Sequence, residues 1–422
     1  MAGRNQGNSA SFFWELQGFR VAYVEIRKAP TAREPGRRIR VVGLEDGRDH
    51  HVCSECGKHH GEGVSQEWDA RMWRDCSLGD FETYVEIVPW RVACCGGTRV
   101  ESFPWEADGH RMTRRFFERL AALCTRLPVS EVAKMANLSW DTVARVDKEA
   151  IKLGLGGTEP DLGKLRWIGV DEVSRNGGRV YFTVITNLES GAVVHIGDGK
   201  GEAGLRSFLD RLPNRLRKRI RGTTSDLGYL SLLKKAFHNA VHILDRFHIV
   251  KWVNDALNQL RRQEYGGAPR TEGGKVVKAK KWLLLSARER LDQGHKVVLA
   301  RLMKLNRRIY RAYLLKEQLR EILHYPWRYF GALQRNLKAW CRSVMYSRIE
   351  PLKKVARRLR PHMEAIVEAF KHDIKMGLVE EVNGKIVKLR RSAHGYRDRE
   401  YFKLKIFQRC SLPSNPWAHI VL

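Results

Sequence analysis

Three acidic residues, far apart in the sequence, have the types and surroundings that two-metal chemistry requires. An apolar, strand-like run ends at Asp171, and a second such run ends at Asp226. Far downstream, an amphipathic helical segment carries Glu380. Carboxylates at the ends of adjacent strands, with one more from a packed helix, can hold two divalent cations and so promote in-line phosphoryl transfer. Either aspartate alone could be an ordinary turn residue at the end of a strand. The three acidic residues together favour a catalytic site.

The net charge of the chain indicates what kind of phosphodiester it binds. Lys and Arg number 77 against 47 Asp and Glu in 422 residues, which gives a net charge of +30. A surplus of this size favours a polyanion, and double-stranded DNA is the partner we expect. A merely basic protein, or one that binds anionic lipid, is the alternative. The sequence has no apolar run of bilayer length and no signal-peptide pattern, so we expect a cytoplasmic, nucleoid-associated protein without membrane contact.

Five of the eight cysteines fall in the first hundred residues, within a segment of strand-like patterning that predicts a β-rich module over 21–108. A Cys-x-x-Cys knuckle and a second cysteine pair after a hairpin are typical of small zinc ribbons. The candidate zinc ligands are Cys53, Cys56, Cys94 and Cys95. Adjacent cysteines bind one ion only with awkward geometry, so His59, His60 or Cys76 could replace one of them. Reduced thiols without metal are the alternative to a structural zinc site.

Residues 109–155 show helical periodicity that is interrupted by turn-forming residues. Ser130 is expected to cap a short second helix and Ser139 to cap a third. Two short helices joined by a tight turn describe a helix-turn-helix, whose second helix offers its first turns to base edges in the major groove. The candidate base contacts are Trp140, Thr142 and Arg145. An ordinary three-helix bundle has the same spacing, and the net charge is what favours DNA contact.

The region from residue 164 to 250 follows the order βββαβαβ, and its first three strands read as an antiparallel meander. By analogy this is the ribonuclease H-like order, in which the first and fourth strands lie side by side and bring Asp171 to Asp226. Residues 251–375 are helical in pattern, as expected for an all-α insertion. The sequence therefore predicts a mixed α/β, multidomain chain. Its predicted parts are an N-terminal tail (1–20), the zinc-ribbon-like β-rich module (21–108), the helix-turn-helix (109–155), the first part of the catalytic core (164–250), the insertion (251–375), and the C-terminal helix and tail of the core (376–422).

Several strings of residues resemble one known family. They are Asp171-Glu172 after an apolar strand, Asp226-x-x-Tyr229, Asp245-Arg246-Phe247-His248-Ile249-Val250-Lys251, the run 379–386 around Glu380, and Arg390-Arg391-x-x-x-Gly395-Tyr396. Together they are similar to the bacterial insertion-sequence transposases of the ISL-three family, and the resemblance covers nearly the whole chain. It implies a DDE transposase in which Asp171, Asp226 and Glu380 bind two Mg²⁺ ions. It also implies that the terminal inverted repeats of the element are the substrate.

The sequence departs from the family pattern in two places. The family usually has glycine after the glutamate, but Glu381 stands there, so the third carboxylate could be Glu380 or Glu381. The second cysteine pair is compressed to the adjacent residues Cys94 and Cys95. On a helix, Glu380 shares a face with Asn383 and Arg391. The glutamate can therefore bind metal ions while Asn383 and Arg391 contact DNA phosphate groups.

The remaining candidate residues are a histidine and a DNA-binding set. His248, three residues after Asp245, could act near the scissile phosphate or could be a structural histidine at a strand end. The residues expected to bind DNA are Trp140, Thr142, Arg145, Asn383, Arg390, Arg391 and Tyr396.

The function we expect is binding of the element ends, cleavage of a phosphodiester at each end, and joining of the freed 3′-hydroxyl to target DNA. Pairing of two ends implies a homo-oligomer. Two other classes of protein keep most of these features. One is a DNA-binding regulator with a zinc module and a helix-turn-helix but no activity, and the other is a nuclease of the same fold that does not join strands.

Overall fold

The computed structural model describes Leu16 and residues 18–29, 37–67, 69–154, 162–176, 178, 180–266, 281–372, 374–393 and 395–411. Contacts between residues divide them into two compact units, one ending at Gly157 and the other spanning Thr158–Leu412. Most of the predicted N-terminal tail, residues 155–161 and the chain from 412 onward lie outside the described residues. No described helix is both long and apolar enough to cross a membrane.

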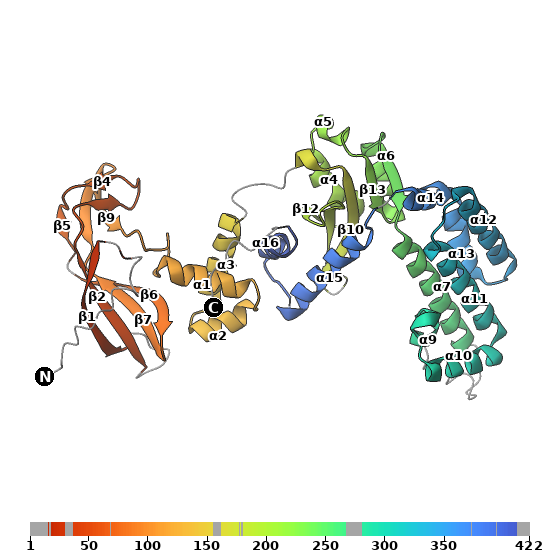
Figure 1. Ribbon diagram of the computed structural model, residues 1–422, viewed down its shortest axis with the longest axis horizontal. Coiled ribbons are helices and arrows are strands. Elements are labelled where there is room, and N and C mark those ends of the chain that lie inside the picture. Colours follow the sequence, from red (N-terminus) through yellow and green to blue (C-terminus); the bar gives the residue numbers. More distant parts are fainter. Residues whose placement is uncertain are drawn as a thin grey trace. The chain divides into compact units, whose positions relative to one another are not determined.

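Two β-sheets form the first part of the N-terminal unit (Figure 1). One has the strand order β1-β2-β7-β6 and the other the order β4-β3-β9-β8-β5. Their strands are β1 (Phe19–Lys28), β2 (Arg38–Asp46), β3 (His51–Cys53), β4 (His59–His60), β5 (Ser65–Gln66), β6 (Arg71–Leu78), β7 (Phe81–Ile87), β8 (Trp90–Cys94) and β9 (Gly97–Ser102). Alternating apolar residues on β2 and β7 pack with an aromatic cluster in which Phe103 and Trp105 stack at 4.9 Å and Trp73 meets both edge-on.

Three helices follow in the same unit, α1 (Arg114–Cys124), α2 (Val129–Ala136) and α3 (Trp140–Gly154). Asn137 ends α2 in the left-handed conformation, with φ 52°, and Ser139 Oγ accepts the backbone N–H of Thr142 at the start of α3. The turn and the Ser139 cap are therefore confirmed. The predicted Ser130 cap is wrong, because α2 begins at Val129 after Pro128, whose fixed φ already suits a helix start.

The second unit is built on a five-stranded sheet with the order β12-β11-β10-β13-β14. Its strands are β10 (Trp167–Asn176), β11 (Val180–Asn187), β12 (Val193–Asp198), β13 (Gly222–Ser225) and β14 (Val241–Leu244). The first three pair antiparallel, as predicted, whereas β10, β13 and β14 are mutually parallel. The first and fourth strands of the unit, β10 and β13, therefore lie side by side.

Strand β10 differs from the prediction in its length. The sequence predicts a strand that stops at Asp171, but β10 continues to Asn176, and Asp171 pairs with Val184 of β11. The reason is that pairing with β11 continues after the ladder with the shorter β13 has ended at Gly169 and Thr224. Asp171 is therefore not the last residue of its strand, but it lies where the neighbouring strand ends.

Helices cover this sheet and extend from it (Figure 1). Leu205, Phe208 and Leu233, from α4 and α6, pack with Ile168 and Val170 of the sheet. Val382 and Ile386 of α15, with Phe402 and Ile406 of α16, pack with β10–β12. The helices around the sheet are α4 (Gly201–Arg211), α5 (Asn214–Arg217), α6 (Leu227–Ala236), α15 (Gly377–Ser392) and α16 (Arg399–Cys410), with the 3₁₀ turn η2 (Leu162–Lys164).

The region predicted as an all-α insertion consists of helices throughout its described part and has one continuous apolar core. That core joins the sheet through Leu244 at the end of β14 and Leu230 of α6. The elements of this region are α7 (Arg246–Gly266), α9 (Lys281–Leu285), η3 (Arg288–Arg290), α10 (Gln293–Leu305), α11 (Arg307–His324), α12 (Phe330–Tyr346), α13 (Glu350–Leu359), η4 (Arg360–His362) and α14 (Met363–Lys371).

Candidate active site and cysteine cluster

The register of three parallel strands brings three aspartates to one edge of the sheet. Gly169 of β10 pairs with Thr224 of β13, and Ser225 of β13 pairs with Leu244 of β14. Asp171 and Asp226 each lie two residues after the first pair, and Asp245 directly follows Leu244. Because side chains alternate along a strand, Asp171, Asp226 and Asp245 continue the series that points to one face of the sheet.

Helix α15 covers that face because β10 carries a glycine where the helix approaches. A Cβ atom on Gly169 would lie 2.4 Å from Cγ2 of Val379, so any larger residue would push α15 away. Val379, Val382 and Ile386 form the buried stripe of the helix. Glu380, the residue after Val379, is thereby held beside the strand that carries Asp171.

Two side chains of α15 face the aspartates. Asn383 Nδ2 donates a 2.6 Å hydrogen bond to Oδ2 of Asp171. Burial raises the pKa of Glu380, and the negative charges of Asp245 and Asp171 raise it further. Glu381 instead forms a 2.7 Å ion pair with Lys385 along the helix. Of the two glutamates that the sequence leaves open, Glu380 is the one within electrostatic reach of the aspartates.

His248 and Asp245 complete the group. Nε2 of His248, which is 9% exposed, lies 3.7 Å from Oδ1 of Asp171. Burial raises the pKa of Asp171, and the carboxylate of Asp245 adds to this, while the backbone N–H of Glu172, the charge of His248 and the amide of Asn383 act in the opposite direction. Burial also raises the pKa of Asp245. The structure thus places Asn383 and His248 beside Asp171.

Asp226 follows the adjacent strand, but its carboxylate is engaged elsewhere. Its Oδ1 accepts the backbone N–H of Gly228 at 2.7 Å and caps α6. Tyr229, in the first turn of α6, is buried and its hydroxyl donates to Oε1 of Glu172 at 2.9 Å while accepting from the N–H of Gly201. This bridge fixes the start of α6 against β10. Among the described residues, no side chain forms a hydrogen bond or an ion pair with the carboxylate of Asp226.

The other residues expected to bind DNA are distributed over both units. The guanidinium of Arg390 donates to the carbonyl of Ser174 on β10, whereas Arg391 is exposed. The ring of Tyr396 stacks on Phe402 at 4.7 Å and is partly buried between α15 and α16. In the N-terminal unit, Trp140 is 48% exposed. Arg145 is also exposed on α3, and the Thr142 hydroxyl lies 2.7 Å from that of Ser139.

The four candidate zinc ligands converge. Sγ atoms of Cys53, Cys56, Cys94 and Cys95 all lie within 4.8 Å of one another. Cys95 adopts the left-handed conformation, with φ 52°, and this turn lets two adjacent cysteines face one point. Backbone N–H groups of Cys56 and Glu55 lower the pKa of the Cys53 thiol to about 7. Four soft sulfur donors with an easily ionised member suit a structural Zn²⁺ ion.

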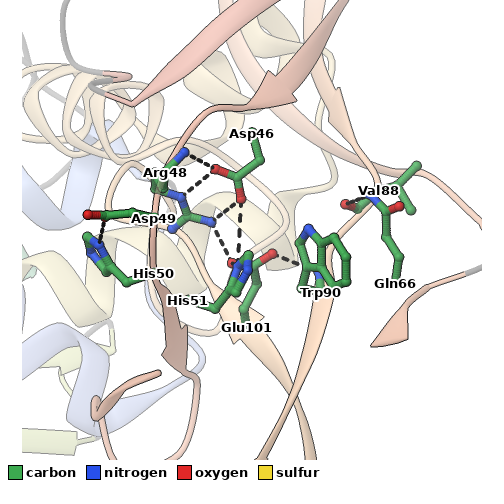
Figure 2. A network of polar contacts seen from close by, with 9 residues as sticks. All are labelled: Asp46, Arg48, Asp49, His50, His51, Gln66, Val88, Trp90 and Glu101. Atoms are coloured by element: carbon green, nitrogen blue, oxygen red, sulfur yellow. Dashed lines mark hydrogen bonds and ion pairs between the residues drawn. The ribbon is translucent and has the colours of Figure 1, made fainter. Parts of the chain in front are cut away.

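A buried polar network supports the knuckle, as Figure 2 shows. The guanidinium of Arg48 binds the carboxylates of Asp46 and Glu101. Nδ1 of His51 lies 3.1 Å from the same Glu101, whose other oxygen accepts the backbone N–H of Trp90 at 2.7 Å. The network links the end of β2 to β3, β8 and β9. Cys53 and Cys94 are the last residues of β3 and β8, and Cys56 and Cys95 lie in the turns that follow. It therefore holds the cysteine-bearing hairpins against the four-stranded sheet that contains β2.

Comparison with known proteins shows the family of the chain. Residues 168–406, more than half of the chain, match a family described as transposase of the DDE, ISL3 type, and residues 101–151 match the helix-turn-helix domain of transposase family ISL3. The chain is 28% identical over 405 residues to the transposase for insertion sequence element IS1001 of Bordetella parapertussis, covering 94% of this chain and 96% of that protein. It is 27% identical over 378 residues to the transposase for insertion sequence element IS1557 of Mycobacterium tuberculosis, with 82% of each chain covered.

The class of protein is therefore an insertion-sequence transposase of the DDE type with a helix-turn-helix DNA-binding domain. Within that class, the chain belongs to the ISL3 family.

The sequence-based reasoning missed Asp245 and did not foresee the bond of Asn383 to Asp171. Asp245 follows a strand, as Asp171 and Asp226 were expected to do, so the same pattern of an apolar run ending on aspartate could have identified it. The bond between Asn383 and Asp171 had no sequence signal beyond the shared helix face with Glu380.

Proposed function

We propose that this transposase binds the terminal inverted repeats of its own insertion sequence, cleaves a phosphodiester bond at each end, and joins the freed 3′-hydroxyl to target DNA. The strand order β12-β11-β10-β13-β14 supports a ribonuclease H-like catalytic core with a helical insertion. The observation that carries the proposal is the approach of α15 to β10, because it brings Glu380 within the electrostatic influence of Asp171.

The residues of this site fit a pair of Mg²⁺ ions. Mg²⁺ prefers oxygen ligands and usually keeps several waters. Asp171, Asp226 and Glu380 would supply carboxylate oxygens, and Oδ1 of Asn383 is a buried oxygen without a hydrogen-bond partner among the described residues. An orphaned acceptor beside a carboxylate group suits a metal-bound water. The chemistry that two such ions supply is activation of the attacking oxygen and stabilisation of the leaving one.

The protein side chains have separate tasks in this scheme. Asn383 would fix the orientation of the Asp171 carboxylate, and the Tyr229 bridge would fix the helix that begins at Asp226. His248 would donate a hydrogen bond to the scissile phosphate or to a water beside Asp171. Exposed Arg391 would bind the DNA backbone near the site.

End recognition would belong to the N-terminal unit. Trp140 and Arg145 are exposed at the beginning of α3, where a recognition helix meets base edges. A Zn²⁺ ion bound by the four cysteines would stabilise the hairpins beside it. Since two ends are processed together, we propose that the active form is a homo-oligomer.

The test uses a supercoiled plasmid that carries the DNA segments bordering this gene, with Mg²⁺ and the full-length protein. Asp171→Asn and Asp226→Asn should each lower strand cleavage by more than about 100-fold while end binding persists. Unchanged cleavage in either variant would exclude that residue as a metal ligand. Cleaved ends that are never joined to a second plasmid would indicate a nuclease and contradict the proposed strand transfer.

A further inference from the structure

The first turn of α7 carries a phenylalanine that the apolar core does not bury. Phe247 is 50% exposed. The buried residues of α7 form one stripe that includes Ile249 and Val253, and both belong to the core of the helical insertion. Two positions along a helix correspond to a rotation of about 200°, so Phe247 lies on the side opposite Ile249. Single exposed apolar residues are ordinary, and the position of this one is what distinguishes it.

The Phe247 ring lies beside the proposed active site. Its centroid is 6.0 Å from that of the His248 ring, and the two rings meet edge to face. Nε2 of His248 is in turn 3.7 Å from Oδ1 of Asp171. One strand of DNA advances about 3.4 Å per nucleotide. These two distances therefore span the nucleotides next to a phosphate bound at Asp171.

The backbone of Phe247 is fixed although the residue is half-exposed. Its N–H donates to Oδ1 of Asp245 at 2.9 Å. On one side of it, the guanidinium of Arg246 donates to the carbonyl of Leu323 at 3.0 Å, and on the other side Ile249 is fully buried. An aromatic ring on a rigid backbone binds a planar group with little loss of conformational entropy.

The surroundings of the ring suit a nucleobase. Lys251, one turn further along α7, is exposed and can bind a DNA phosphate. Proteins that bind single strands combine such cations with aromatic rings on which the bases stack. In a duplex both faces of a base are covered by its neighbours, so only a base that has left the stack can lie on the Phe247 ring.

We propose that Phe247 is a stacking site for one unpaired base of the element end, next to the phosphate that is cleaved. This inference rests on the proposed function, which brings DNA to Asp171. Stacking would hold the duplex open beside the cleavage site and orient the scissile phosphate toward Asp171. The competing explanation is that the ring packs against a second copy of the chain.

Cleavage of a short duplex that carries the element end, by the full-length protein with Mg²⁺, tests the site. Phe247→Ala should lower cleavage by about 5- to 100-fold, which is the loss expected for one stacked base. Phe247→Trp keeps a planar ring and should cleave nearly as the unmodified protein does. Phe247→Leu keeps only the apolar character and should be impaired. Tyr346→Ala is the matched control, since it removes another exposed ring, 85% exposed, at the end of α12, and it should leave cleavage unchanged.

Substrates that lack one base distinguish stacking from a structural role of the ring. An abasic residue is placed in turn opposite each base beside the cleavage site, so that this base has no pairing to lose. At one of these positions the cleavage defect of Phe247→Ala should shrink by at least about fivefold. Its midpoint of thermal unfolding should be unchanged, because the side chain is half-exposed, and gel shifts should show unchanged binding of the element ends.

Each other outcome overturns something specific. If Phe247→Ala cleaves the paired duplex as the unmodified protein does, the inference is wrong and the proposed function stands. The inference also fails if Phe247→Leu cleaves normally, or if the defect of Phe247→Ala is the same on paired and abasic substrates. Dissociation of an oligomer in Phe247→Ala would identify the ring as a contact between copies instead. If the unmodified protein cleaves none of the substrates, the proposed function fails and the inference fails with it.

Discussion

The side-chain amide of Asn383 and the carboxylate of Asp171 are joined by a 2.6 Å hydrogen bond across 212 positions of the chain. The bond connects α15 to the central strand of the sheet, so the helix that carries Glu380 has a polar tie in addition to its apolar contacts. We expect Asn383→Ala to lower DNA cleavage by about 10- to 100-fold, because the bond holds a metal-binding carboxylate in position. End binding, measured by gel shift, should be unaffected. Full cleavage activity in this variant would show that the bond has no role in catalysis.

Gly169 controls how closely α15 approaches β10. In Gly169→Ala the new methyl group would lie 2.4 Å from Cγ2 of Val379 and 3.0 Å from Cδ2 of Leu188. Overpacking of this kind should lower the free energy of unfolding by about 1–3 kcal/mol and should reduce cleavage as Glu380 is displaced. Adding Val379→Ala should restore part of both.

Gly384 on the same helix is the control for that experiment. An added Cβ there would meet no atom within 4 Å, so Gly384→Ala should stabilise α15 by about 1 kcal/mol and leave cleavage intact. Equal destabilisation by Gly169→Ala and Gly384→Ala, measured by urea denaturation, would contradict the packing argument.

The stability of the metal-free protein should depend on pH through Asp171. Burial raises the pKa of this residue, and Asp245 adds to the effect. An acid whose pKa rises on folding binds its proton more tightly in the folded state than in the unfolded state. The ionised acid therefore destabilises the folded state. This effect is absent below the unfolded pKa of about 4 and grows as the pH rises through the folded pKa. In EDTA, Asp171→Asn should therefore be more stable than the unmodified protein at about pH 7, with a smaller difference at about pH 4.

Thermal unfolding across that range tests this expectation. The exposed Asp255 provides the comparison, because Asp255→Asn should give a difference that does not vary with pH. A stabilising effect of Asp171→Asn that grows toward acid pH would contradict the burial argument.

The cysteine cluster should bind about one equivalent of zinc with four thiolate ligands. Cys94→Ser and Cys95→Ser should each lower the zinc content of the purified protein and its midpoint of thermal unfolding. Cys76 lies on β6 and is not among the four converging sulfur atoms, so Cys76→Ser should retain the metal. The zinc content of each purified variant, measured by metal analysis, tests this ligand set. Loss of zinc in Cys76→Ser together with retention of zinc in Cys95→Ser would exclude it.

The sequence predicted the parts of the site that depend on local pattern. Apolar runs of strand type located the strands of Asp171 and Asp226, and helical periodicity located the helix of Glu380. The first and fourth strands are neighbours, as the order of elements indicated. Local pattern also gave the Ser139 cap of α3, because a cap is decided within four residues.

Contacts between distant segments were beyond such reasoning. The choice between Glu380 and Glu381 depends on which helix stripe is buried, and that stripe is set by Val379 packing on Gly169. The extension of β10 past Asp171 depends on pairing with β11, which persists where β13 has ended. Cys95 faces the other three cysteines through a left-handed turn that a residue other than glycine or asparagine seldom adopts. Each of these features is fixed by tertiary packing.

The most direct test of the account compares two neighbouring glutamates in one assay. Glu380→Gln and Glu381→Gln make the same chemical change on adjacent positions of α15, but only Glu380 is within electrostatic reach of Asp171 and Asp245, while Glu381 pairs with Lys385. With Mg²⁺ and a plasmid carrying the element ends, Glu380→Gln should reduce strand cleavage by more than about 100-fold, and Glu381→Gln should cleave as the unmodified protein does. Normal cleavage by Glu380→Gln, or its loss only in Glu381→Gln, would contradict the proposed active site.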